Sequence, residues 1–232
     1  MRLFCLPYAG GGASIYKDWA AQLPSQVDVC TVQLPGRENR IMETAFTRMG
    51  PLVERLTAEM GPALDVPFAM FGHSMGAIIC FETALRLQRE GKGSPAGLLL
   101  SARRAPPFPP NNDAMYDLPD GEFRERLRHL NGTPEAVLEN EELMDLMLPL
   151  LRADFELDDT YRPSAGDMLH CPVTAFGALS DSEVPRDQLE SWRNVTHGAF
   201  RLRMFPGDHF FIHKHRGALV NAVTEDLMRV LG

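Results

Sequence analysis

Short apolar runs alternate with longer stretches whose apolar residues recur at helical spacing, and this alternation constrains the fold of the chain most. Most of the apolar runs are too uniformly apolar to have a solvated face; they are RLFCLP, VDVCTVQL, PFAMFG, AGLLLSA, CPVTAFGA and FRLRMF. The stretches with helical spacing are IYKDWAAQL, MGPLVERLTAEM, MGAIICFETALRLQREG, PRDQLESWRN and HKHRGALVNAVTEDLMRVL. This order predicts an α/β domain with a mostly parallel sheet and helices on both faces, whose ligands bind beyond the carboxyl ends of the strands.

Residues 106–162 interrupt the alternation, because they contain no convincing strand. They begin with PPFPP and continue with two helical patterns, GEFRERLRHLNG and ENEELMDLMLPLLRADFELDD. Residues 110–162 contain 14 Asp and Glu against 5 Arg, a charge of −9; since the whole chain carries −8, the remainder carries +1. We predict one domain, 1–232, with a helical insertion at about 106–162 that is either a lid or an ordinary acidic surface.

The composition excludes several classes of function. With 232 residues, of which 23% are charged and 44% hydrophobic, the chain resembles an ordinary globular protein, and we expect a monomer. The charge of −8 argues against a nucleic-acid partner, because phosphate backbones are bound by basic surfaces. Neither a membrane span nor an export signal is visible, so we expect no membrane partner and a cytoplasmic location. The cysteines are scattered without metal-binding spacing, which indicates reduced thiols and no metal site.

The segment Gly72-His73-Ser74-Met75-Gly76 lies between a predicted strand and a predicted helix. G-x-S-x-G in this setting is typical of a nucleophile elbow, the sharp turn that exposes a serine hydroxyl at the start of a helix. The positions two before and two after the serine must be small, which explains both glycines. Ser74 is therefore the candidate nucleophile; the alternative is a serine in an ordinary turn between strand and helix.

A serine hydroxyl becomes a good nucleophile when an imidazole takes its proton and a carboxylate orients that imidazole. After a nucleophile elbow the chain order is serine, acid, histidine. His209 is the candidate base because it follows the last predicted strand directly, in PGDHFF, whereas His213 and His215 already belong to the final helix. The loop LSDSEVP offers Asp181 and Glu183 as the acid, and we prefer Asp181 because it lies nearer the end of its strand.

The oxyanion formed on attack needs two N–H donors directed at it. One candidate is the backbone N–H of Met75, directly after the nucleophile. The other is the backbone N–H of Ala9, in the loop PYAGGGAS, because Gly10, Gly11 and Gly12 let the chain turn inward there. A phosphate-binding loop is disfavoured because no Lys-Ser or Lys-Thr pair follows these glycines.

The motifs LPYAGGGAS, QLPGRENR, FGHSMGA, CPVTAFGALSD and FPGDHFF, in this order, closely resemble type II thioesterases, the separate editing enzymes of nonribosomal peptide and polyketide biosynthesis. The resemblance extends from Leu3 to the final helix. It implies an α/β-hydrolase fold with a helical lid, a triad of Ser74, Asp181 and His209, and the two oxyanion donors already chosen. Tyr8 departs from the pattern, because many members carry His there, and this concerns the mouth of the pocket.

The resemblance also implies hydrolysis of acyl thioesters on the phosphopantetheine arm of acyl or peptidyl carrier proteins, with no cofactor of the enzyme's own. Carrier proteins are usually acidic, so docking should favour arginines near the active edge of the sheet. Arg37, Arg40, Arg103 and Arg104 are the candidates, and solvated loop charges are the alternative interpretation. Two other functions stay open: a carboxylesterase for free esters, and a noncatalytic hydrolase-like binding module, which would be expected to lack a triad residue.

Overall fold

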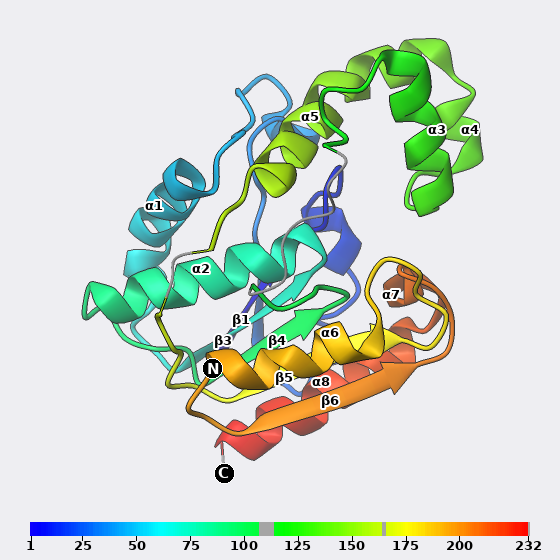
Figure 1. Ribbon diagram of the computed structural model, residues 1–232. Helices are drawn as coiled ribbons and strands as arrows, with labels where there is room; N and C mark the ends of the chain where they lie inside the picture. The colour runs from blue at the N-terminus through cyan, green and yellow to red at the C-terminus, as the bar shows by residue number, and fades with distance from the viewer. Residues whose placement is uncertain (107–113, 164–165, 232) are drawn as a thin grey trace.

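We describe a computed structural model of the protein, for residues 1–106, 114–163 and 166–231 (Figure 1). Six strands form one sheet in the order β2-β1-β3-β4-β5-β6, and every neighbouring pair is parallel. The strands are β1 (Arg2–Leu6), β2 (Asp28–Thr31), β3 (Phe68–His73), β4 (Gly97–Ser101), β5 (Val173–Ala178) and β6 (Phe200–Phe205). Each strand lies within one of the predicted apolar runs, except that β3 extends one residue further, to His73, so the predicted parallel sheet is confirmed.

The central strands are apolar on both faces because two hydrophobic clusters sandwich the sheet. Along β3, Met70 belongs to one cluster, whereas its neighbours Ala69 and Phe71 belong to the other, as the period of two in a strand requires. The first cluster includes residues of α1 (Met49–Met60) and α2 (Met75–Arg89), and the second includes residues of α8 (Arg216–Leu231). These helices cover opposite faces of the sheet in Figure 1, as the sequence predicted.

The end of α2 illustrates how a local signal sets an element boundary. Gly91 follows the helix with φ +64°, a conformation that suits glycine. The Gly91 N–H donates to the carbonyl of Gln88, and the Lys92 N–H donates to that of Leu87. This is the Schellman pattern, and it confirms Gly91 as the predicted helix stop.

Residues 15–23 do not form the predicted helix. A short 3-10 helix (Ala13–Tyr16) is followed by turns. The helical spacing arises because Tyr16, Trp19 and Leu23 all pack into the second hydrophobic cluster, which successive turns also allow. The Tyr16 hydroxyl donates to the carbonyl of Leu6, so this segment is held by a contact with β1.

Two other predicted helices are divided in the structure. The final one consists of α7 (Phe211–Lys214) and α8, separated at His215. The stretch after β5 consists of α6 (Arg186–Glu190) and a 3-10 helix (Ser191–Val195). Further short 3-10 helices occupy Glu38–Arg40 and Gly61–Ala63.

Between β4 and β5, the described residues form three helices: α3 (Asp120–Leu130), α4 (Glu135–Leu138) and α5 (Glu141–Asp159). We call them the inserted helices. They stand away from the sheet in Figure 1 and have a hydrophobic cluster of their own, formed by Met115, Phe123, Leu127, Leu138, Met144, Leu148 and Leu151. The sequence predicted α3 and α5 but not the short α4. Residues 107–110, in the proline-rich start of the predicted insertion, lie outside the described residues. Within the described part of the chain, no helix is both long and apolar enough to span a membrane.

Candidate active site

Ser74 occupies the turn between β3 and α2, with φ +53°, which is unusual for a residue other than glycine. A Cβ on Gly72 would lie 2.2 Å from the carbonyl oxygen of Gly76, and a Cβ on Gly76 would lie 2.3 Å from that of Leu6 in β1. Both glycines are therefore required by backbone atoms that cannot easily move. The local geometry is that of the nucleophile elbow predicted from the sequence.

The structure brings the predicted serine, histidine and aspartate together. Nε2 of His209 lies 3.1 Å from Oγ of Ser74, and its Nδ1 lies 2.9 Å from Oδ2 of Asp181. Both distances are those of hydrogen bonds. The three residues follow β3, β6 and β5, so the carboxyl ends of three parallel strands deliver them to one place.

Both carboxylate oxygens of Asp181 have partners, and its side chain is fully buried. While Oδ2 faces His209, Oδ1 accepts hydrogen bonds from the N–H groups of Glu183 (2.8 Å) and Val184 (3.2 Å). An ionised carboxylate can only accept, so Nδ1 of His209 carries the proton and Nε2 is free to accept the Ser74 hydroxyl proton. Glu183, the alternative acid, contributes a backbone N–H to this arrangement.

His73 is a buried polar residue of the site that the sequence did not single out, although it lies within the G-x-S-x-G motif. Its Nδ1 lies 2.9 Å from Oγ of Ser101, and its ring centroid lies 5.5 Å from that of His209. Burial lowers the pKa of His73 well below its ordinary value, and the nearby His209 and His213 act in the same direction. The imidazole is therefore neutral and supports His209 by packing.

Tyr8, the residue that departs from the family pattern, forms an aromatic wall beside the site. Its hydroxyl lies 2.8 Å from Nε2 of His213, and its ring stands edge-on to Phe210 at 5.1 Å between centroids. Burial raises the pKa of Tyr8 to about 12, so the phenol is neutral. His213, set aside in favour of His209 as the base, instead holds this tyrosine.

Both predicted oxyanion donors border the same cavity as Ser74. Met75 is the first residue of α2, so its N–H has no acceptor within the helix and lies at the positive end of the helix dipole. Ala9 lies in a turn closed by a hydrogen bond from the Gly11 N–H to the carbonyl of Tyr8, at 2.9 Å. The structure thus places the two N–H groups on the two loops that the sequence indicated.

The cavity has a volume of about 140 Å³, roughly ten times the space that one water molecule needs. Apolar side chains of the elbow helix, the inserted helices and the loop after His209 form much of its wall: Ile78, Leu127, Leu130, Leu151, Phe155 and Phe210. Charged residues form another part: Arg103, Arg104, Arg126, Asp158, Asp159 and Glu183. The cavity can therefore hold an acyl group with both apolar and polar portions against Ser74.

The four arginines proposed for docking have different environments. Arg37 is buried, with 4% of its side chain exposed, and pairs with Asp154, so the prediction that it contacts a partner protein is wrong. The acidic insertion provides this buried partner, which a charge count cannot reveal.

The other three arginines are more accessible. Arg40 pairs with Glu43, and Arg103 pairs with Asp158 while also lining the cavity. Arg104 lines the cavity too, and burial lowers its pKa. No group of His, Cys, Asp and Glu side chains suited to hold a metal occurs in residues 1–106, 114–163 and 166–231.

The thioesterase domain family matches residues 1–227. The chain belongs to this family. The thioesterase is 42% identical over 231 residues to gramicidin S biosynthesis protein GrsT of Aneurinibacillus migulanus. The aligned region covers 100% of this chain and 90% of that protein. The predicted family is thereby confirmed.

Solved structures agree with this assignment. The thioesterase resembles ClbQ from the colibactin NRPS/PKS pathway with a TM-score of 0.93 and 31% identity, over 99% of this chain and 97% of that one. It resembles the type II thioesterase BorB from the borrelidin biosynthetic cluster with a TM-score of 0.88 and 38% identity, over 97% and 91%. The protein is a thioester hydrolase with the α/β-hydrolase fold of this family, as the sequence predicted.

Proposed function

We propose that this thioesterase removes acyl groups held as thioesters on the phosphopantetheine arm of acyl or peptidyl carrier proteins, and so clears stalled or mis-primed carriers in nonribosomal peptide or polyketide assembly. The observation that carries the proposal is the chain of hydrogen bonds from Ser74 through His209 to Asp181, in which Ser74 lines a cavity suited to an acyl group. Relatives from gramicidin S and colibactin biosynthesis support the class of pathway.

In the proposed mechanism, Oγ of Ser74 attacks the thioester carbonyl while Nε2 of His209 takes its proton. The N–H groups of Ala9 and Met75 bind the resulting oxyanion. The C–S bond then breaks, and His209 returns the proton to the leaving sulfur. The product of this half-reaction is an acyl ester on Ser74 and a free phosphopantetheine thiol.

Water completes the reaction. Nε2 of His209 takes a proton from the water as it attacks the acyl ester, and a second oxyanion forms at the same N–H groups. When this intermediate collapses, Oγ of Ser74 leaves with the proton from His209, and a free carboxylic acid is released. Each step uses side chains and backbone N–H groups of the chain itself.

The inserted helices act in this proposal as a lid over a single catalytic domain. The support is that the cavity is lined both by the elbow, at Ser74 and Ile78, and by Leu127 and Leu151 of the insertion. Arg40, Arg103 and Arg104 stay the proposed contacts for an acidic carrier protein. The reaction is placed in the cytoplasm, in keeping with four free cysteines.

The test measures release of acyl groups from a phosphopantetheinylated carrier protein and from the matching free ester. Ser74→Ala should lower kcat by more than about 10⁴-fold. Ser180→Ala, which removes an exposed hydroxyl after β5, is the matched control and should leave release unchanged. Substantial release by a clean Ser74→Ala preparation contradicts the mechanism, whereas turnover of the ester with an inert acyl-carrier favours a carboxylesterase.

A further inference from the structure

A buried ion pair connects the inserted helix α5 to the core of the protein. Nη2 of Arg37 lies 2.8 Å from Oδ1 of Asp154, and Nη1 lies 3.0 Å from Oδ2, so the guanidinium binds both carboxylate oxygens. Only 4% and 2% of the two side chains are exposed. Removing two charges from water is unfavourable, so a buried pair is weak evidence for stability alone and invites a search for another role.

The same pair holds the glycine-rich loop that carries the Ala9 N–H. Oδ2 of Asp154 accepts a hydrogen bond from the Gly10 N–H at 2.7 Å, and Nη1 of Arg37 donates to the carbonyl of Gly11 at 3.0 Å. Burial raises the pKa of Asp154, while the Arg37 guanidinium and the Gly10 N–H act in the opposite direction. One helix of the insertion thus bonds directly to the backbone of this loop.

The bond to Gly10 controls the orientation of a peptide group within a turn. The Gly11 N–H bonds to the Tyr8 carbonyl, and Gly10 at the third position has φ +77°, as a type II turn requires. In a type I turn the central peptide, between Ala9 and Gly10, is reversed. That reversal would turn the Ala9 carbonyl toward the Asp154 carboxylate, which repels it. The Ala9 N–H belongs to the preceding peptide, between Tyr8 and Ala9, so the bond to Gly10 acts on it by holding the turn in which Ala9 lies.

Packing supports the same contact. A Cβ on Gly10 would lie 2.5 Å from Cδ2 of Leu151, which is also in α5, one turn before Asp154. The loop therefore approaches α5 so closely that only glycine fits without movement of Leu151. Its position depends on where the helix lies.

We propose that Asp154, held by Arg37, is a positioning residue that fixes the glycine-rich loop with the Ala9 N–H directed at the oxyanion. This inference rests on the proposed function, which assigns Ala9 as a donor. It implies that the oxyanion site is complete only while the C-terminal half of α5 is docked on the core. Asp154 does not line the cavity with Ser74, so its effect on the reaction passes through the loop.

Two double variants test the proposal, because removing both charges avoids leaving one of them buried and unpaired. Arg37→Met with Asp154→Leu removes the acceptor for the Gly10 N–H. Arg37→Met with Asp154→Asn keeps an amide oxygen there. In steady-state assays with carrier-bound thioester, we expect kcat to fall about 10²-fold in the leucine variant, the loss typical of one oxyanion donor, with KM changed by less than about threefold. The asparagine variant should keep kcat within about tenfold of wild type.

Glu156→Gln is the matched control. Glu156 lies on the same helix, but its carboxylate pairs with Arg48 and not with the glycine-rich loop, so the kcat of this variant should not change. Equal losses of kcat in the two double variants, or a folded leucine variant with the wild-type kcat, overturn the proposal.

A second measurement needs no substitution. Hydrogen exchange should show the Gly10 amide of the wild-type protein to be protected, and exchange as fast as in an open peptide overturns the proposal even when the leucine variant does not fold. A failure of the proposed function is distinguishable, because the wild-type protein would then show no Ser74-dependent release.

Discussion

Replacing Asp181 by Asn changes one of its two carboxylate oxygens to an NH2 group. The surrounding hydrogen bonds decide whether the NH2 group takes the place of Oδ1 or of Oδ2. Oδ1 accepts from two backbone N–H groups, those of Glu183 and Val184, whereas Oδ2 faces Nδ1 of His209. An NH2 group at the first position would oppose two donors. The Asn side chain therefore keeps its oxygen there and presents its NH2 group to His209.

This orientation imposes the wrong tautomer on the imidazole. Facing a donor, Nδ1 of His209 must accept, so the proton moves to Nε2, which lies 3.1 Å from Oγ of Ser74. A protonated Nε2 cannot take the serine proton. We expect kcat to fall by about 10⁴, equivalent to about 5.5 kcal/mol of transition-state stabilisation, with KM little changed because the cavity wall is intact.

Asp181→Ala separates this effect from simple loss of the carboxylate. It leaves the N–H groups of Glu183 and Val184 without their acceptor, which should destabilise the fold by about 1–3 kcal/mol, whereas Asp181→Asn should unfold near the wild-type temperature. A water molecule can accept from Nδ1 of His209 in the alanine variant, so its kcat should exceed that of the asparagine variant.

The assay is acyl release from carrier protein combined with thermal unfolding of each variant. Glu183→Gln is the control for the alternative acid and should retain activity. An Asp181→Asn enzyme that keeps more than a tenth of the wild-type kcat refutes the tautomer argument. A large loss of kcat in a folded Glu183→Gln variant would assign the role of the acid to Glu183.

Two further predictions concern residues around the elbow. Burial lowers the pKa of His73, so below about pH 6.5 its imidazole takes up a proton in the unfolded chain but not in the folded protein, and stability is lost as the pH falls. His73→Asn should therefore flatten the pH dependence of the unfolding temperature between about pH 5 and 7. An unchanged slope contradicts a buried, neutral His73. Gly76→Ala should destabilise the protein by about 3 kcal/mol or more, because the added Cβ would meet the backbone oxygens of Leu6 and Pro7. Gly121→Ala in α3, where space is open, should instead stabilise it by about 0.5 kcal/mol. Urea unfolding measures both changes.

The sheet and the three hydrogen-bonded side chains of the candidate site could be predicted because each depends on local patterns and chain order. A strand such as β3, buried on both faces, reads as a continuous apolar run whatever its neighbours are. Ser74 needed only two glycines at fixed spacing. Asp181 and His209 could be chosen because parallel strands bring their carboxyl ends to one edge, so the first suitable residues after β5 and β6 meet the serine.

Features that depend on contacts between distant segments could not be predicted. The apolar spacing of residues 15–23 fits a helix, but the Tyr16 hydroxyl bonds to Leu6 and the segment forms turns instead. No local signal marks the division of the final helix at His215. The packing of His73 against His209 was also invisible, because it requires the relative positions of the end of β3 and the loop after β6, which are far apart in the chain.

The charge of the insertion shows most clearly what a sequence pattern leaves undetermined. A count gives −9 for residues 110–162 but does not tell buried charges from exposed ones. On the C-terminal half of α5, three acidic residues have basic partners on other elements; the pairs are Asp154 with Arg37, Glu156 with Arg48, and Asp158 with Arg103. The first pair is buried, whereas the other two are partly exposed.

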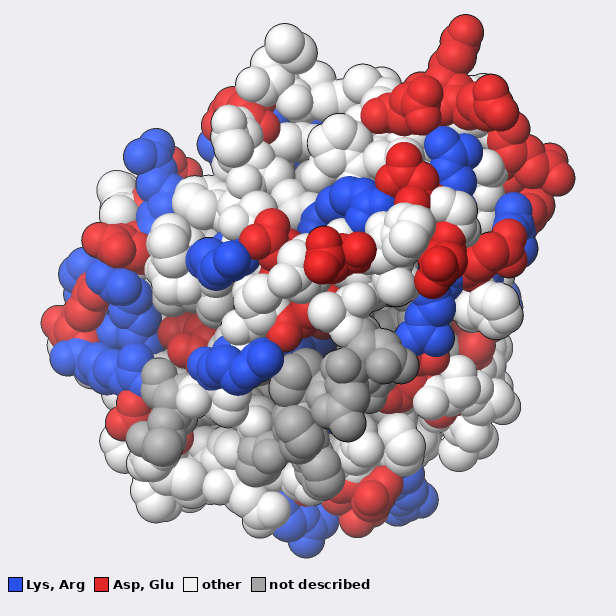
Figure 2. All heavy atoms as spheres, turned by 45° about the horizontal axis from the view of Figure 1, so that its top comes forward, with Lys and Arg blue, Asp and Glu red and all other residues white. Residues whose placement is uncertain are grey.

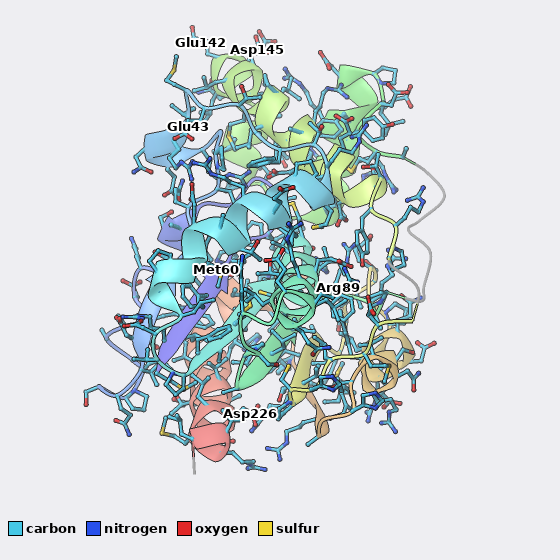
Figure 3. All side chains as sticks on the ribbon, turned by 90° about the vertical axis from the view of Figure 1, so that its left-hand side faces the viewer. Glu43, Met60, Arg89, Glu142, Asp145 and Asp226 are labelled. Carbon is cyan, nitrogen blue, oxygen red and sulfur yellow. The ribbon has the colours of Figure 1, made fainter. Side chains whose placement is uncertain are left out.

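More exposed acidic residues lie elsewhere on the insertion. Glu142 and Asp145 project from the outer end of α5, far from the sheet (Figure 3), and Figure 2 shows Asp and Glu side chains gathered at one side of the face that it presents, with basic side chains spread over the rest. An acidic partner is repelled by uncompensated charge at short range, within about a Debye length. Repulsion should thus be weak at Asp154, which Arg37 neutralises, and stronger at this outer end, where Glu142 is exposed while Asp145 pairs with Arg124.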